Sequence, residues 1–400
     1  MSILNLKYGN GVVTLNVRNA AQLQKFDLPK TVPLADAGSE FVNAASYRCS
    51  GSLGLHYLIS PNDLITVVIR ENRYLPVAET LYMLTYYLHS LGVPYENITV
   101  LAKADTQGAS VSHLLPPQLN GLIKAEAHHC DDPNLVSVGT TSHGIPVLVN
   151  PLLTGRKVII LDSIQRDVLT GFSGGPECLL GLCGRSTIEK CFSQAIQGNT
   201  LPAQVRSGII VGNPLCDEMT EIARFINPAF AVYTITDAKK HFCRFACGGW
   251  LDAWYEGCNA FQQLFGIPVS GQYDIVIASC GGAPYDATLY AACRSLFHAV
   301  QFAKEGGTVI LAAEGREGGP DQFINGQEPL ASLYGLTYFG FQDLVKKYRV
   351  LIQSKINTQQ LCNLGLEAFR TMETLESRVD FNGKTVCFFS NADLAAPYQV

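Results

Sequence analysis

The sequence predicts an α/β fold of two domains, with mostly parallel sheets flanked by helices and a cleft between the domains. Short, continuous apolar runs recur along the chain, and amphipathic helical patterns lie between them. Strands buried on both faces of a parallel sheet are apolar throughout, whereas the helices that cover such a sheet have one apolar face. A chain of 400 residues is also too long for one ordinary core, which favours two domains.

The individual elements follow from these periodicities. The apolar runs predict strands at 64–69, 98–101, 157–161, 209–211, 273–278 and 307–312. The helical patterns predict helices at 77–91, 216–225, 250–264, 287–303 and 358–371. Most of the glycine-rich motifs follow a strand, which is where ligands bind in sheets of this kind.

A turn-rich segment, Gly266-Ile-Pro-Val-Ser-Gly271, is the best candidate for a domain boundary. We therefore expect an N-terminal domain that binds a cofactor or phosphate at 1–265 and a C-terminal α/β domain at 266–400. The last helix or the tail of the second domain is expected to pack back on the first.

Composition excludes several classes of function. The net charge of −5 gives no reason to expect nucleic acid or a membrane surface as a partner, and the apolar runs are too short to span a bilayer. Thirteen scattered cysteines without a Cys-x-x-Cys pair favour reduced thiols and a cytoplasmic location. The chain lacks both the Gly-x-Gly-x-x-Gly signature of dinucleotide-binding enzymes and the Gly-x-x-x-x-Gly-Lys-Ser/Thr loop that binds nucleoside triphosphates.

Two glycine-rich segments, Gly139-Thr-Thr-Ser-His-Gly-Ile-Pro-Val147 and Gly171-Phe-Ser-Gly-Gly175, lie about thirty residues apart. Backbone N–H groups in such turns suit a phosphate, and glycine lets the backbone approach it closely. Two such segments favour one nucleotide-like ligand, while the plainer alternative is a pair of structural turns. The predicted ligand-binding residues are Thr140, Thr141, Gly144, Ser173, Gly174 and Gly175.

With Lys7-Tyr-Gly9, Gly212-Asn-Pro214, Ser279-Cys-Gly-Gly-Ala-Pro-Tyr-Asp286 and Glu314-Gly-Arg-Glu-Gly-Gly319, these motifs make the chain resemble the nickel-dependent lactate racemase family. The resemblance implies two α/β domains with the active site between them. It also implies a nickel-pincer nucleotide, which takes a hydride from a 2-hydroxy acid and returns it to either face.

Several residues match positions that the family uses in catalysis. His128 matches the first catalytic base, and Arg73 matches an arginine that follows the strand at 64–69. Tyr290 and Arg294 match a substrate-facing tyrosine and, conservatively, a lysine, and they lie one helical turn apart. The neighbouring His129 is expected to be structural.

Other family positions have changed. The lysine that tethers the pincer nucleotide corresponds to Glu177, and the second catalytic histidine corresponds to Asp167. The nickel-binding histidine falls at Phe192 or Ser193, neither of which binds nickel well. The metal ligands therefore stay unknown.

Three interpretations remain open. In the first, the nucleotide binds without its tether, and nickel has altered ligands such as Cys178, Cys183 or Cys191. In the second, His128 and Asp167 perform metal-free acid–base chemistry on a carboxylate. In the third, the chain binds a ligand without turnover. The leading prediction is a racemase or epimerase of a 2-hydroxy acid or related carboxylate. The alternative is a non-catalytic or metal-free homologue that binds a carboxylate or nucleotide. The expected partner is a small carboxylate, and the oligomeric state stays open.

Overall fold

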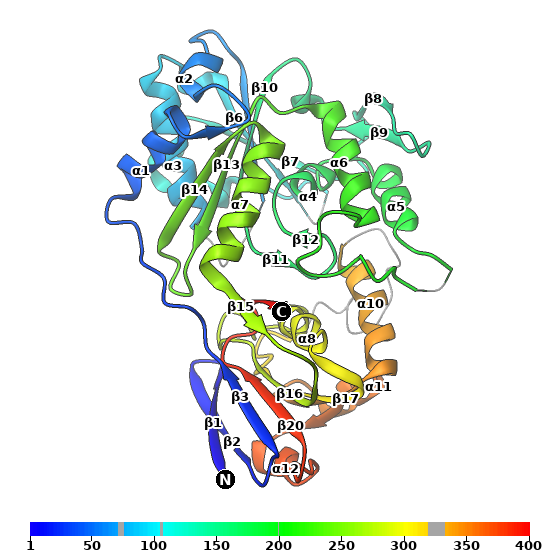
Figure 1. Cartoon of the computed structure of the whole chain (residues 1–400). Coiled ribbons are helices and arrows are strands. Elements are labelled where there is room, and N and C mark those ends of the chain that lie inside the picture. The colour runs from blue at the N-terminus through cyan, green and yellow to red at the C-terminus, as the bar shows by residue number, and fades with distance from the viewer. Residues whose placement is uncertain (71–75, 105–106, 199, 319–332) are drawn as a thin grey trace.

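The computed structural model describes residues 1–70, 76–104, 107–198, 200–318 and 333–400, and its two large sheets form two lobes (Figure 1). The first sheet has seven strands and the second has six. Helices flank both, and parallel pairing dominates, which confirms the predicted α/β fold class.

The seven-stranded sheet contains most of the strands predicted in the first half of the chain. Its order is β4 (Cys49–Ser50), β14 (Phe242–Gly248), β13 (Phe230–Thr236), β10 (Lys157–Ser163), β5 (Ile65–Ile69), β6 (Ile98–Lys103) and β7 (Lys124–His128). Only the β13–β14 pair is antiparallel.

The apolar runs are continuous because both faces of this sheet are covered. Val67 packs into the core on one face, and its neighbour Val68 packs into the core on the other. Ile159 and Ile160 of β10 alternate in the same way. The helices of this lobe are α1 (Ala37–Ser46), α2 (Leu55–Leu58), α3 (Val77–Ser90), α4 (Pro176–Leu180), α5 (Arg185–Gln194), α6 (Pro214–Ile226) and α7 (Trp250–Phe265).

The six-stranded sheet is parallel throughout. Its order is β19 (Glu367–Phe369), β18 (Arg349–Gln353), β17 (Ala303–Ala312), β16 (Tyr273–Ser279), β20 (Thr385–Phe389) and β3 (Gln22–Phe26). Its helices are α8 (Leu289–Val300), α10 (Leu333–Lys347), α11 (Thr358–Asn363) and α12 (Met372–Glu376).

The start of the chain belongs to this second sheet. The β1–β2 hairpin (Ser2–Tyr8 and Gly11–Val17) packs on its core, and β3 is its edge strand beside β20. In Figure 1 the N-terminus accordingly lies in the same lobe as the segments from the end of the chain. The domain bounds stay a prediction, but residues 1–26, which the sequence analysis assigned to the first domain, lie with the second.

The boundary segment and the tail pair with each other. The turn-rich segment forms β15 (Gly266–Val269), which pairs in parallel with β21 (Ala396–Gln399) near the C-terminus. The Pro397 carbonyl also accepts a hydrogen bond from Arg166 of the first lobe at 2.9 Å. The tail therefore contacts both lobes.

Two predicted elements are wrong. Residues 209–211 form a loop, because Gly212 adopts a φ of +74° and Asn213 then caps α6. The helix predicted at 358–371 ends at Asn363, because Gly365 turns the chain with a φ of +90° and 367–369 enter the sheet.

Candidate functional site

A group of charged side chains lies where β5 and β10 end and α4 begins. Arg70 follows β5, and its Nη1 donates to Oε1 of Glu177 at 2.5 Å. Its Nη2 donates to Oδ1 of Asp162 at 3.4 Å. Both carboxylates are more than nine-tenths buried, whereas the Arg70 side chain is 27 % exposed. Arg70 is thus the cation that compensates two buried anions.

Burial controls the protonation of these groups. It raises the pKa of Glu177 from 4.5 to about 7, although the Arg70 charge opposes the shift. Burial alone would lower the pKa of Arg70, but the charges of Asp162 and Glu177 raise it. Glu177 therefore changes its charge near neutral pH while Arg70 stays protonated.

Asp167 lies beside this group on a short hairpin formed by β11 (Arg166–Asp167) and β12 (Gly171–Phe172). Its Oδ1 accepts from the backbone N–H of Leu169 at 3.0 Å and from both the N–H and the hydroxyl of Thr170 at 2.8 and 2.9 Å. These bonds fix the carboxylate in place. Its charge acts on both Arg70 and Glu177, so the three groups form one electrostatic unit.

Arg294 reaches the same region from α8 of the second lobe. Its Nε donates to Asp393 at 2.9 Å, and its Nη2 donates to the Gln165 side chain at 3.2 Å and to the Arg166 carbonyl at 3.1 Å. Burial alone would lower its pKa, but the charges of Asp393 and Asp167 raise it. We call Arg70, Asp162, Asp167, Glu177 and Arg294 the charged centre.

The glycine turn at 171–175 is packed inside the protein. The Ser173 hydroxyl donates to the Ser163 carbonyl at 3.1 Å and accepts from the Gln165 N–H at 3.1 Å. A Cβ on Gly175 would lie 2.7 Å from the Trp254 ring, and Gly174 also has a positive φ. The turn needs glycine to fit against α7, which matches the structural alternative to phosphate binding.

The second glycine segment forms the hairpin of β8 (Val136–Thr140) and β9 (Pro146–Val149). Thr140 and Gly144 are exposed, and the Thr141 hydroxyl accepts from the N–H of Ile145 at 3.2 Å. At the tip, His143 bonds to Glu218 of α6 at 2.6 Å. A carboxylate beside the tip does not suit a phosphate, because like charges repel.

His128 is enclosed at the end of β7. Its exposed fraction is 0 %, Nε2 lies 3.0 Å from the Cys183 carbonyl, and Nδ1 lies 3.4 Å from the Asn150 amide. Burial lowers its pKa, which favours a neutral ring. No contact between described residues joins His128 to the charged centre, so its predicted catalytic role has no geometric support.

The remaining predicted residues fall in different places. Tyr290 is half-buried one turn before Arg294 on α8, and its phenol acts electrostatically on Arg294. Arg73 lies outside the described residues. Phe192 is a core residue, and the Ser193 hydroxyl donates to its own helix at the Glu189 carbonyl at 2.7 Å, so neither is placed to bind a metal.

The three cysteines that might have replaced the histidine ligand are buried thiols. Burial raises the pKa of Cys183 to about 12 and raises those of Cys178 and Cys191 well above their usual values. A protonated thiol is a poor metal ligand and a poor nucleophile.

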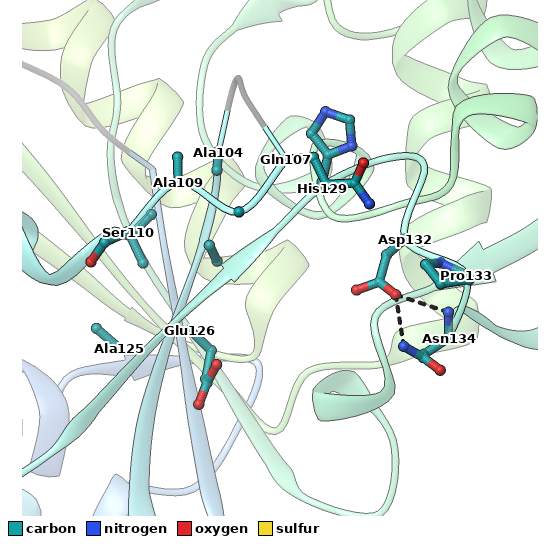
Figure 2. Close-up of a pocket in the computed structure, with 13 residues that line it drawn as sticks. Ala104, Gln107, Ala109, Ser110, Ala125, Glu126, His129, Asp132, Pro133 and Asn134 are labelled. Atoms are coloured by element: carbon teal, nitrogen blue, oxygen red, sulfur yellow. Dashed lines mark hydrogen bonds between the residues drawn. The ribbon is translucent and has the colours of Figure 1, made fainter.

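A hollow of about 460 Å³ lies beside the carboxyl ends of β6 and β7 (Figure 2). Figure 2 shows His129 and Asp132 on its wall, with Asp132 hydrogen-bonded to Asn134. None of the site residues predicted from the sequence lines this hollow.

The charged centre contains Asp162, which was not singled out from the sequence, and Arg70, which was noted there only as a second cation in the loop of Arg73 that could bind a carboxylate or phosphate. Asp162 lies near the carboxyl end of a predicted strand, and Arg70 directly follows another. Charged residues at the carboxyl ends of neighbouring parallel strands are the signal that would have found both.

Among the described residues, no helix combines the length and the apolar character that a bilayer crossing requires.

Comparison with known proteins gives consistent matches. The family model of the lactate racemase N-terminal domain matches residues 8–201, and that of the lactate racemase C-terminal domain matches residues 269–329. The lactate racemase of Lactiplantibacillus plantarum is 28 % identical over 190 residues, which cover 47 % of this chain and 44 % of the relative. That of Thermoanaerobacterium thermosaccharolyticum is 25 % identical over 186 residues, which cover 46 % and 43 %. Each match thus spans less than half of the relative.

Solved structures extend the likeness of the fold to nearly the whole chain. The lactate racemase apoprotein of Thermoanaerobacterium thermosaccharolyticum superposes with a TM-score of 0.84 and 17 % identity, over 99 % of this chain and 100 % of that chain. A protein from Thermotoga maritima superposes with a TM-score of 0.60 and 14 % identity, over 84 % and 93 %. At these identities the likeness concerns the fold alone.

Proposed function

Since the chain belongs to the lactate racemase family, we propose that it binds a small 2-hydroxy carboxylate at the charged centre without a nickel-pincer nucleotide. The observation that supports this most directly is the ion pair between Arg70 and Glu177. It occupies the position where the resemblance implies a tethering lysine. Two arginines from different lobes, Arg70 and Arg294, are the cations that a ligand carboxylate would contact, in competition with their present carboxylate partners.

The described residues do not fit the pincer nucleotide. Glu177 offers a carboxylate instead of an amine, and it is already paired with Arg70. Ser173 uses its hydroxyl within the protein, and Phe192 is buried in the core. At these three positions the side chains are therefore unsuited to attaching the nucleotide, contacting its phosphate or binding nickel, which supports a function without it.

Binding of a carboxylate at this centre is coupled to a proton. While Glu177 is ionised, it competes with the ligand for Arg70. When Glu177 takes up a proton, Arg70 keeps its charge and its pairing with Asp162 but loses its second anionic partner, so an incoming carboxylate can take the place of Glu177. Because the pKa of Glu177 is about 7, affinity should rise as the pH falls through neutrality.

Epimerisation is the second candidate, and the raised pKa of Glu177 favours it. A carboxylate that titrates near neutral pH suits a general base. Glu177 would take the proton from the ligand's α carbon, the C–H electron pair would pass into the ligand carboxylate as an enediolate, and the arginines would stabilise the added charge. A proton delivered from water to the opposite face of the enediolate would complete the inversion.

Calorimetric titration tests the binding proposal. We expect both enantiomers of lactate and of 2-hydroxybutyrate to bind, the methyl ester of lactate not to bind, and Arg70→Gln to weaken binding about 10-fold or more. Arg349→Gln is the matched control, because Arg349 pairs with Glu367 at the far edge of the second sheet. Binding that is unchanged in Arg70→Gln, or no carboxylate binding in wild type, would refute the proposal.

Incubation in D₂O separates the two candidates. Chiral chromatography with mass detection should find deuterium at the α carbon of the inverted enantiomer if proton transfer operates. Inversion without deuterium would indicate hydride transfer and contradict the cofactor-free interpretation. Binding without inversion of the ligand would support the binding function and exclude epimerisation. Metal analysis and native mass spectrometry of the same sample check that no nickel or nucleotide has co-purified with the protein.

A further inference from the structure

A second cluster of ligand-type side chains lies away from the charged centre, between the β8–β9 hairpin and α6. His143 comes from the hairpin tip, and Glu218 and Glu221 are three residues apart on α6, so they share one face of the helix. One ligand atom of each lies within 4.8 Å of the others. The helix is held firmly, since the Asn213 side chain caps it through the N–H groups of Leu215 and Cys216.

Glu218 is incompletely compensated. The residue is only 3 % exposed, and its Oε2 lies 2.6 Å from Nδ1 of His143. Its Oε1 is buried and has no hydrogen-bond partner in the described part of the chain. A buried carboxylate oxygen without a partner is costly, and a cation is the group that satisfies it best.

The residues around the cluster hold its carboxylates in place and include one cation, Arg224. Glu221 accepts from the N–H and the hydroxyl of Ser142, at 2.6 and 2.8 Å, which draws its carboxylate toward the tip. The positive charge of Arg224, on the same helix, acts on the Glu221 carboxylate by a Coulombic interaction. Cys191 of α5 faces Glu218, but burial, with the Glu218 charge adding to it, keeps the thiol protonated by raising its pKa.

We propose that His143, Glu218 and Glu221 bind one divalent transition-metal ion, of which Zn²⁺ is the type, and that this ion clamps the β8–β9 hairpin to α6. One imidazole nitrogen with two carboxylates is a donor set for such ions, whereas Mg²⁺ and Ca²⁺ prefer oxygen alone. The His143 side chain is 63 % exposed, so water can complete the coordination. A small opening of the contact between His143 and Glu218 makes room for the ion.

A competing cluster, His129, Cys130 and Asp131, is less suited to an ion. Its Asp131 already receives two hydrogen bonds from Arg185, both at 2.6 Å. That guanidinium supplies the positive charge that a metal would otherwise provide.

Titration of the chelator-treated, full-length protein with Co²⁺ near neutral pH tests the proposal. The readouts are the visible absorption of bound Co²⁺, the rise in melting temperature, and competition by Zn²⁺. We expect wild type to bind one Co²⁺ ion per chain. His143→Ala and Glu218→Gln should each weaken the affinity for Co²⁺ by at least about 10- to 100-fold. Mg²⁺ at the same concentration should give no such rise.

Two control variants make the result decisive. His241 also contacts a carboxylate, Asp237, at 3.1 Å, and His241→Ala should bind Co²⁺ like wild type. His129→Ala should do the same, because it removes only the competing cluster. Undiminished binding in both His143→Ala and Glu218→Gln, loss in His129→Ala, or no Co²⁺ binding by wild type would each overturn the proposal. If a variant fails to fold, as judged by its circular dichroism, Glu221→Gln replaces it as the ligand variant.

Discussion

Replacing Glu177 by glutamine should remove a pH-dependent loss of stability. The folded protein raises the pKa of Glu177 from 4.5 to about 7, chiefly through burial. Between these values the unfolded chain has already released the proton that the folded chain retains. Raising the pH through this range therefore favours unfolding of wild type, and the effect is complete above about pH 7. Glutamine carries no titratable proton and lacks this dependence.

The size of the effect follows from the same pKa. At about 1.4 kcal/mol for each pH unit, the difference between 4.5 and about 7 corresponds to about 3 kcal/mol. The side chain is only 8 % exposed, so solvent screening reduces this little. An unfolding entropy of about 2.1 cal/mol/K per residue over 400 residues converts it to about 4 °C, provided that both lobes unfold together.

Differential scanning calorimetry from about pH 5 to about pH 8 measures this change. The melting temperature of Glu177→Gln minus that of wild type should increase by about 3 °C across the range, because part of the effect is already present at pH 5. Glu367→Gln is the control: its hydrogen bond with Arg349 lowers the pKa of Glu367, so its contribution is lost only below the ordinary carboxyl range. If Glu177→Gln and wild type give parallel curves, the assignment of Glu177 as a buried, titrating partner of Arg70 is incorrect.

Two further predictions concern packing. Gly175→Ala should lower the free energy of unfolding by about 3 kcal/mol or more in urea titrations, because φ is +51° and the new Cβ would meet Trp254. Gly144→Ala, with an open surrounding, should cost only about 1 kcal/mol, and equal losses would contradict the packing argument. Arg294→Met should cost about 3 to 5 kcal/mol, because it leaves the buried Asp393 without its cation. Adding Asp393→Leu should restore most of that loss, and a double variant as unstable as the single one would refute the pairing.

The strands of the two sheets were predictable where burial on both faces leaves a continuous apolar run. Residues 64–69, 98–101 and 157–161 correspond to β5, β6 and β10 within one residue at their starts and within two at their ends. Residues 209–211 have the same composition but lie in a loop. Three residues before a glycine are too few for sheet pairing to outweigh the turn.

Pairing partners were less accessible than strand positions. The period of the β3 sequence gives no indication that it joins the end of the chain, since β20 lies more than 350 residues later. β3 can take the edge position only because the second sheet leaves one side of β20 open for pairing. Such long-range pairing is fixed by packing and not by local pattern.

The candidate site was predicted in its chemistry more than in its arrangement. The charge of Asp167 acts on both Glu177 and Arg294, but the roles that the family resemblance implies for these residues stay predictions. His128 was selected because it matches the family's first catalytic base, and an imidazole enclosed by Cys183 and Asn150 looks the same in sequence as one that faces a ligand. Its exposure could be known only from the three-dimensional packing.

The pairing of β3 with β20 affects how this polypeptide is completed during synthesis. β3 is synthesised more than 350 residues before β20, the strand beside which it lies, so it cannot pair until that later segment has been made. The peptide chain also passes twice between the lobes, once after β3 and once at β15. A single proteolytic cut in either connection would leave the lobes joined covalently through the other.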